Sequence, residues 1–108
     1  MTVATLCEKA KLNAILCPEP TREVEGAYCG DLLSWVMGRA KSGDVWITIM
    51  SNLNILAVAS LADVSCVLLA EGVTPDEELI KTAEQKGINI LASDKTSYEL
   101  ANIVGSLI

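Results

Sequence analysis

The sequence predicts an α/β fold of three layers, α/β/α, in which helices cover both faces of a small, mostly parallel sheet of about four strands. Three observations predict it. Apolar runs of strand length alternate with segments of helical periodicity along the whole chain. The connections between these segments are short, as is typical of successive βαβ units. The run at 65–70 is apolar on both faces, as expected of an inner strand in a parallel sheet.

The first thirty residues predict one helix and one strand before an irregular stretch. The segment 2–11 has the pattern of an amphipathic helix, and Thr2 is placed to cap it. The short apolar run at 12–16 is predicted to be the first strand. Two prolines at 17–21 exclude a helix and a central strand, so we expect a loop there. Residues 23–30 are interpreted as irregular or as a short strand.

The middle of the chain predicts two helices on either side of a strand. The segment 31–41 has apolar residues at helical spacing, and Asp31 is expected to be its N-cap. A turn at 42–44 leads into a strand at 45–50. The following helix, at 53–61, consists almost entirely of small and aliphatic residues, so it should be largely buried.

The last third of the chain contains two capping boxes, which predict where two helices begin. The first is TPDE at 74–77, with proline at the first helical position. The helix that it opens is expected to end at Gly87, and a strand at 88–92 should follow. The second box is TSYE at 96–99, which opens a last helix that should reach about Leu107.

Composition and charge exclude several classes of protein. With 108 residues, 51% of them hydrophobic and none of them Phe, the chain is expected to form a single domain, 1–108, around an aliphatic core. The net charge of −6 disfavours binding to nucleic acid, because an acidic surface repels phosphates. The absence of histidine removes Ser-His-Asp and Cys-His catalysis and the commonest metal ligand.

No membrane segment is expected in this sequence. The charge-free stretch at 45–62 is interrupted by hydroxyl and amide side chains, so a strand and a buried helix fit it better than a membrane span. The start of the chain lacks the basic and apolar regions of a signal peptide. We therefore expect a cytoplasmic protein.

Four cysteines, Cys7, Cys17, Cys29 and Cys66, are widely spaced and form no CxxC pair. This spacing favours free thiols in a reducing compartment and predicts no metal site. An iron–sulfur or metal site that uses cysteines from two copies of the chain remains an alternative.

Polar residues follow the predicted strands, at the positions where parallel strands would bring them to one edge of the sheet. In open α/β sheets this C-terminal edge is where ligands bind. The candidate ligand-binding residues are Ser51, Asn52, Asn54, Glu71, Gly72, Ser93 and Asp94. The loop at 17–19 is expected to join them, and the N-termini of the following helices are expected to offer backbone N–H groups. Each residue also has a purely structural interpretation, since Ser51 or Asn52 would cap the next helix.

Catalysis is not expected, although one arrangement would allow it. Glu71 and Asp94 are an alternative acid/base pair, but no nucleophile accompanies them. The Gly-rich phosphate-binding motifs GxxxxGK[ST] and GxGxxG are both absent, and no cofactor is predicted.

From about Gly26 to Leu100 the chain resembles the DRTGG domain family. The stretches that resemble it are GDLLSWVMGRAKSGDVWITI, LLAEGVTPDEELIKTAEQKGINIL and the helix start TSYE. The family's Asp-Arg falls on Ser51-Asn52 and its Thr-Gly-Gly on 70–72, so only Gly72 is retained and the chain looks like a divergent, stand-alone branch. The resemblance implies a fold similar to the N-terminal domain of HPr kinase/phosphorylase, dimerisation, and a regulatory role without established catalytic activity.

We therefore predict a non-enzymatic regulatory or sensing domain, a homodimer, that binds a small ligand or a protein partner at the C-terminal edge of the sheet. The alternative is a pure homodimeric interaction module, which would bury the helix at 53–61 or the face around Trp35. The resemblance implies hydrogenase-like redox proteins or signalling proteins as associates of such a module.

Overall fold

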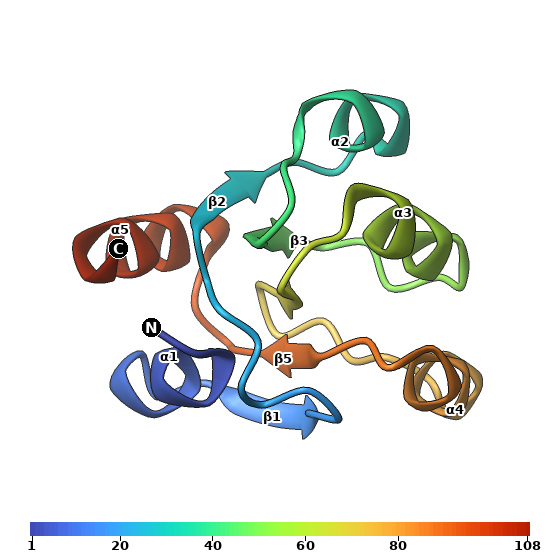
Figure 1. Ribbon diagram of the computed structural model, residues 1–108, viewed down its shortest axis with the longest axis horizontal. Coiled ribbons are helices and arrows are strands. Elements are labelled where there is room, and N and C mark those ends of the chain that lie inside the picture. The colour runs from blue at the N-terminus through green and yellow to red at the C-terminus, as the bar shows by residue number, and fades with distance from the viewer.

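A five-stranded sheet with the order β1-β5-β4-β3-β2 lies at the centre of the molecule, and helices cover both of its faces (Figure 1). The computed structural model describes residues 1–108. The elements follow the chain in the order α1 (Val3–Lys9), β1 (Asn13–Leu16), β2 (Gly26–Cys29), α2 (Leu33–Arg39), β3 (Asp44–Thr48), α3 (Asn54–Ala62), β4 (Cys66–Leu69), α4 (Glu77–Lys86), β5 (Ile90–Ala92) and α5 (Ser97–Leu107). The predicted three-layer α/β fold is confirmed.

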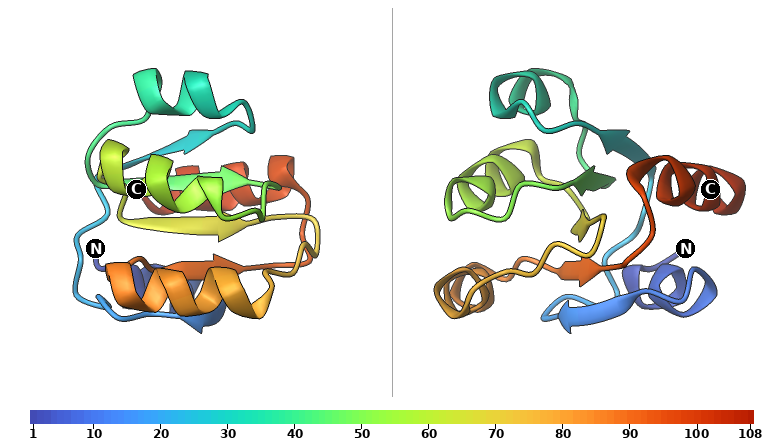
Figure 2. Two further views of the ribbon diagram at one scale, coloured as in Figure 1. Left: turned by 90° about the vertical axis from the view of Figure 1, so that its right-hand side faces the viewer. Right: turned by 180° about the vertical axis from the view of Figure 1, so that it is seen from behind.

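The helices divide between the two faces of the sheet, and each face has its own apolar core. Helices α2, α3 and α4 cover one face, and α1 and α5 cover the other (Figure 1 and Figure 2). The strand side chains that face α2, α3 and α4 are Trp46, Val67, Leu69, Ile90 and Ala92. Those on the face of α1 and α5 are Val45, Ile47, Cys66, Leu68, Ala70 and Leu91. This alternation explains why the inner strands are apolar on both faces.

Strands β2, β3, β4 and β5 are parallel neighbours, as the sequence predicted. Trp46 of β3 pairs with Tyr28 on one side and with Val67 on the other, and Val67 pairs with Ile90 of β5. The carboxyl ends of these four strands therefore meet at one edge of the sheet.

Strand β1 runs antiparallel to β5, and this changes the position of one predicted site segment. The sheet has five strands instead of about four, because part of the segment 23–30, interpreted as irregular or as a short strand, joins it as β2. Since β1 points the opposite way, the loop at 17–19 lies at the N-terminal edge, so its predicted position with the other candidate residues is wrong. Residues 17–25, which we call the crossing segment, then run along the N-terminal ends of the strands to β2 (Figure 2).

Three local signals for the ends of helices were right. Thr2 accepts a hydrogen bond from the backbone N–H of Thr5 and caps α1. Thr96 and Glu99 form the predicted capping box of α5. Gly87 ends α4 with a φ of 70°, as predicted.

Two predicted caps were wrong. The N-cap of α4 is Asp76, whose carboxylate accepts from the backbone N–H of Leu79 at 2.9 Å, and Thr74 lies outside the helix. Asp31 does not cap α2, because its carboxylate bonds across to the end of β3. Asp76 makes a local cap nearer to the helix than the predicted one, whereas Asp31 makes a tertiary contact instead of a cap.

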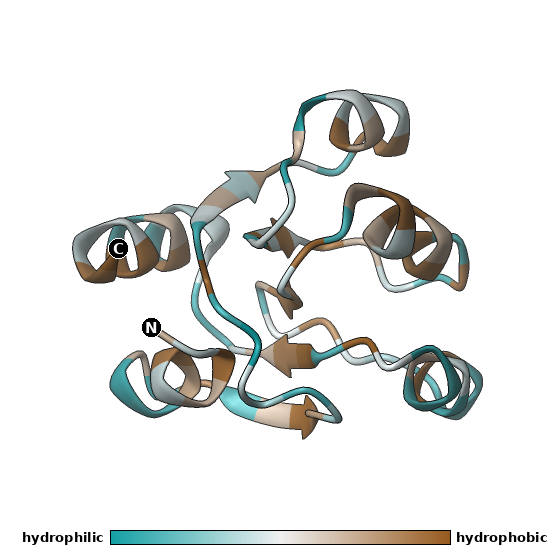
Figure 3. Ribbon diagram, viewed as in Figure 1, coloured by the Kyte–Doolittle hydropathy of each residue, from teal (hydrophilic) through white to brown (hydrophobic).

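Helix α3 is the most apolar helix of the structure and packs on the sheet through Ile55, Leu56, Val58 and Ala59, all buried. It is brown along most of its length in Figure 3, as is β5. Trp46 is completely buried and its indole N–H donates to the Gly30 carbonyl at 2.9 Å, whereas Trp35 is 52% exposed. None of the helices combines the length and the apolar run that crossing a membrane requires.

Candidate functional site

The candidate site lies at the C-terminal edge of the sheet, where the loops after β2, β3, β4 and β5 emerge in a row. Neighbouring strands in a sheet lie about 4.8 Å apart, so loops that follow adjacent strands are within contact distance. The backbone N–H of Ala70 donates to the Thr48 carbonyl at 3.0 Å, and that of Ser93 donates to the Leu69 carbonyl at 3.0 Å. The predicted residues after β3, β4 and β5 therefore share one edge.

The chain changes face between two neighbouring strands of this edge. After β4 it passes to α4, on the face of α2 and α3, whereas after β5 it passes to α5, on the opposite face (Figure 1). Loops that diverge in this way leave a crevice between them, and ligands of open α/β sheets bind at such switch points. The sheet therefore contains one switch point among its parallel strands, between β4 and β5.

A cavity of about 160 Å³ occupies this switch point. It is lined by Asn13, Ile15, Gly72, Val73, Thr74, Pro75, Ala92, Ser93 and Asp94. Three of the predicted residues, Gly72, Ser93 and Asp94, are thus brought together, and the backbone N–H of Gly72 donates to the Ser93 carbonyl at 3.0 Å. Asn13 and Ile15 were missed, because they come from the antiparallel edge strand and no local pattern marks them.

The backbone conformation and the close neighbours at position 72 favour glycine there. Its φ is 74°, in the left-handed region, and a Cβ at this position would lie 3.3 Å from the carboxylate oxygen Oδ1 of Asp94. Glu71, just before it, also has a positive φ, of 61°. The two residues form a tight turn that keeps side chains away from the Asp94 carboxylate.

Glu71 is held by α5 and does not line the cavity. Its carboxylate accepts from the backbone N–H of Ser97 at 3.0 Å, and its own N–H donates to the Lys95 carbonyl at 2.8 Å. A carboxylate at this position is stabilised by the first turn of the helix. The arrangement therefore gives Glu71 a capping role and does not set it opposite Asp94 as an acid/base partner.

Ser51 and Asn52, in the loop between β3 and α3, and Asn54, the first residue of α3, lie on the same edge but outside the cavity. The Asn52 side-chain oxygen accepts from the backbone N–H of Asn54 at 3.0 Å, so Asn52 has the structural role that its position before a helix predicts. The seven predicted residues therefore form one row and not one pocket.

The N-termini of α3, α4 and α5 offer fewer N–H groups at this edge than we expected, whereas α2 has no side-chain cap. Side chains of the protein already accept from Leu79 in α4, from Ser97 and Glu99 in α5, and from Asn54 at the start of α3. Two of these acceptors are carboxylates. A phosphate ligand would have to displace them, so this edge is poorly suited to polyanions.

Asp31 also lies at the C-terminal edge of the sheet, and the sequence did not predict its contacts there. Its carboxylate accepts from the Thr48 hydroxyl at 2.8 Å and from the backbone N–H of Ile49 at 2.9 Å. These bonds tie the loop after β2 to the loop after β3. The loops also carry three exposed apolar side chains, which we call the apolar rim: Leu32, Ile49 and Leu53.

The four cysteines are free, and burial raises the pKa of each thiol. The effect is largest at Cys66, where burial raises the pKa to about 12. The structure contains no group of three or more Cys, Asp or Glu side chains placed to hold a metal ion. Cys66 therefore has the environment of a packing residue, whereas Cys29 is exposed.

Comparisons with known proteins assign the sequence to a family and find solved structures with a similar fold. The family model for the DRTGG domain matches residues 22–107. No curated protein matches the sequence. Among solved structures, the chain is similar to the CBS and DRTGG domains of the regulatory region of Clostridium perfringens pyrophosphatase, crystallised with its activator diadenosine tetraphosphate. The TM-score is 0.71 at 16% identity, over 95% of this chain and 45% of that one, so this chain spans less than half of the regulatory region.

Proposed function

Because this chain belongs to the DRTGG domain family, we propose that it is a regulatory or sensing domain without catalytic activity, which recognises a small ligand at the C-terminal edge of its sheet. The observation that carries the proposal is the cavity between the β4 and β5 loops, at the switch point of the sheet. The free thiols support a cytoplasmic location as part of the same proposal.

The shape and charge of this cavity limit the ligand. Its volume of about 160 Å³ is below the range of typical sites for drug-sized molecules, which begins near 300 Å³. The ligand, or the part of it that enters, is therefore small. Asp94 lines the cavity and the helix N–H groups nearby are occupied, so we expect a neutral or cationic group with hydrogen-bond donors.

The structural relative gives the proposal a context but not a ligand. The Clostridium perfringens regulatory region was crystallised with its activator diadenosine tetraphosphate, and it contains CBS domains as well as the DRTGG domain. A polyphosphate is poorly matched to an edge that carries Asp31, Glu71 and Asp94. We therefore propose that this chain takes a different, less anionic ligand.

A thermal-shift screen with nucleosides, polyamines, sugars and diadenosine tetraphosphate tests the proposal. We expect at least one uncharged or cationic compound to raise the melting temperature of the wild-type chain in a concentration-dependent way. Asp94→Asn should abolish that shift, because it removes the carboxylate that lines the cavity while keeping its size.

Ser51→Ala provides the matched control, since Ser51 lies on the same edge but outside the cavity. The shift should persist in this variant. If no compound stabilises the wild-type chain, or if the shift is the same in Asp94→Asn, the ligand proposal is wrong.

The apolar rim favours a second candidate function, a homodimeric interaction module. Leu32 is 58% exposed and Ile49 is 43% exposed, and the Asp31 bond to Ile49 holds their loops together. Trp35 on the adjacent helix is also exposed, with the Arg39 guanidinium 3.8 Å from its ring centroid. Exposed aromatic and aliphatic side chains of this kind are typical of partner surfaces.

Light scattering at several dilutions tests the dimer. Leu32→Asp should make the chain monomeric, and an acidic residue at this N-cap position of α2 should not harm the helix. Leu61→Asp is the matched control, because Leu61 is 72% exposed but lies outside the apolar rim. A wild-type chain that is monomeric at every concentration, or equal behaviour of the two variants, contradicts this candidate.

A further inference from the structure

A larger cavity lies at the opposite, N-terminal edge of the sheet. Its volume is about 400 Å³, within the range of small-molecule sites. The crossing segment forms one wall, the ends of α3 and α4 form the others, and no residue is shared with the C-terminal edge. Polar and charged residues that line it include Glu19, Thr21, Arg22, Ser60, Asp63 and Lys86.

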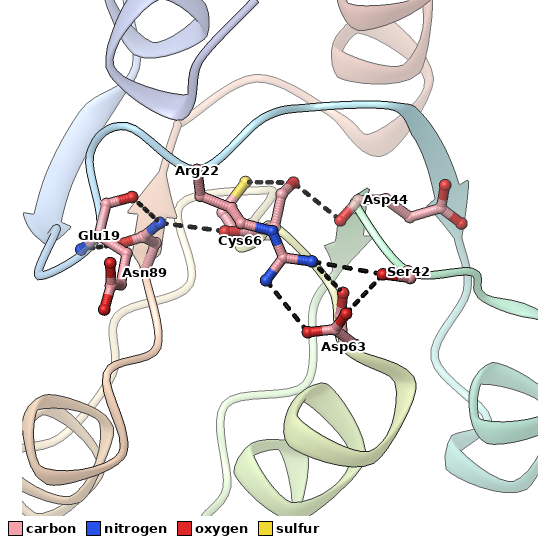
Figure 4. Close-up of polar contacts among 8 residues, drawn as sticks. Glu19, Arg22, Ser42, Asp44, Asp63, Cys66 and Asn89 are labelled. Carbon is pink, nitrogen blue, oxygen red and sulfur yellow. Dashed lines mark hydrogen bonds and ion pairs between the residues drawn. The ribbon is translucent and has the colours of Figure 1, made fainter.

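The walls of this cavity are held in place by bonds within the protein (Figure 4). Asn89 is 2% exposed, and its side-chain amide accepts from the Glu19 N–H at 2.9 Å and donates to the Glu19 carbonyl at 2.8 Å and the Ser65 carbonyl at 3.0 Å. Arg22 donates to the Asp63 carboxylate at 3.1 Å and to the Asp63 carbonyl at 2.8 Å. The crossing segment is therefore positioned before any ligand arrives.

Four polar side-chain groups that line the cavity have no hydrogen bond or ion pair within the protein. They are the Glu19 carboxylate, the hydroxyls of Thr21 and Ser60, and the Lys86 ammonium. Apolar side chains of Ala59, Val64 and Ile88 complete the lining. The lining is therefore mostly polar and carries exposed groups of both charges beside a small apolar area, so it can orient a small polar molecule.

The charges of this cavity indicate what kind of molecule it would bind. Arg22 and Asp63 form an ion pair, so their charges neutralise one another. The anionic Glu19 and the cationic Lys86 also line the cavity, and they do not form an ion pair with each other. The Glu19 carboxylate oxygen Oε1 would lie 3.8 Å from a Cβ on Gly87, beside the end of α4. Helix C-termini attract cations, so a carboxylate in this position marks a place for an ammonium group.

We propose that this cavity binds a small zwitterion of the free amino-acid class. The ligand ammonium lies on Glu19 and the ends of α3 and α4, and the ligand carboxylate lies on Lys86. The hydroxyls of Thr21 and Ser60 add hydrogen bonds, and the apolar lining receives the ligand side chain. This site is on a different edge from the proposed regulatory site, so the two proposals are tested independently.

Isothermal titration calorimetry of the full chain with each of the twenty free amino acids tests this site. At least one should bind, and its N-acetyl and carboxamide derivatives should bind about tenfold more weakly, because each lacks one of the two charges. Glu19→Gln and Lys86→Met should each weaken binding of the free amino acid by about tenfold as well.

Glu84→Gln and Lys81→Met are the matched controls, since both side chains are exposed on α4 and neither lines the cavity. Both should bind as the wild-type chain does. Asp94→Asn, at the opposite edge, should also bind normally, which separates this site from the regulatory proposal. Failure of all twenty amino acids to bind at 10 mM (roughly the weak end of specific sites) overturns the proposal, as does unchanged affinity in both cavity variants.

Discussion

At the scale of single residues, Asn89 is the side chain on which the N-terminal edge depends most. It is buried, and it joins the crossing segment to β4 through three hydrogen bonds. Asn89→Ala leaves the Glu19 N–H and the Ser65 carbonyl without partners, whereas the Glu19 carbonyl still accepts from the Arg22 N–H, so we expect the free energy of unfolding to fall by about 2–3 kcal/mol. Urea denaturation measures this. Asn102→Ala, at an exposed position of α5, should change it by less than about 0.5 kcal/mol.

Asp63 makes the crossing segment sensitive to acid. Hydrogen bonds from the Ser42 hydroxyl and from Arg22 lower the pKa of the Asp63 carboxyl below its ordinary value of 3.8. A carboxyl whose pKa is lowered by folding stabilises the folded state above its unfolded pKa. That stabilisation is lost as the pH falls through the lowered folded value.

The free energy of unfolding should therefore decline as the pH is lowered from about 5 through 3.8 and beyond. Asp63→Asn should decline less steeply over this range, because the variant has no carboxyl to protonate. Denaturation curves at a series of pH values measure the two slopes. Parallel slopes would show that the contacts of Asp63 do not contribute to stability.

At the scale of elements, replacing two of the glycines by alanine should change the stability in opposite directions. Gly72 has a positive φ and lies against Asp94, so Gly72→Ala should lower the free energy of unfolding by about 1 kcal/mol and narrow the C-terminal cavity. Gly38 lies inside α2, and a Cβ at this position would meet nothing within 4 Å. Gly38→Ala should therefore raise the free energy of unfolding by about 0.5–1 kcal/mol. Thermal or chemical denaturation of the two variants should give changes of opposite sign.

The sequence predicted the elements well wherever the determining contacts are local. The Thr96–Glu99 capping box and the Gly87 helix end depend on residues within one turn, and both were right. The direction of β1 was not predictable, because it depends on pairing with β5, more than seventy residues later. The alternating apolar pattern of a short strand is the same whichever way the strand points.

The two candidate sites differ in predictability for the same reason. Gly72, Ser93 and Asp94 follow parallel strands, so the position of each after a strand was sufficient to predict a shared edge. The N-terminal cavity joins Glu19 to Asn89 and Arg22 to Asp63 across long separations in the sequence. No local pattern marks such pairs, and Glu19 was placed at the wrong edge because the strand before it was taken to be one of the parallel strands.

At the scale of the whole molecule, the rates at which the cysteines are chemically labelled measure how well the two helical layers exclude solvent from the sheet. Cys29 is exposed on the edge strand β2, whereas Cys66 is completely buried in the central strand β4 and has a pKa of about 12. With iodoacetamide at pH 8, Cys29 should react first, and Cys66 should react only when the domain unfolds. Mass spectrometry of the peptides over time measures the order. Labelling of Cys66 as fast as Cys29 would contradict the two-sided packing of the sheet.

The most direct test of the central claim, that the C-terminal edge is a recognition surface, is an NMR titration of the ¹⁵N-labelled chain. The titrant is the compound that stabilises it most in the thermal-shift screen and loses its effect in Asp94→Asn. The largest amide shifts should fall in the loops after β4 and β5, at 71–75 and 93–95. Largest shifts at any other part of the molecule would contradict it.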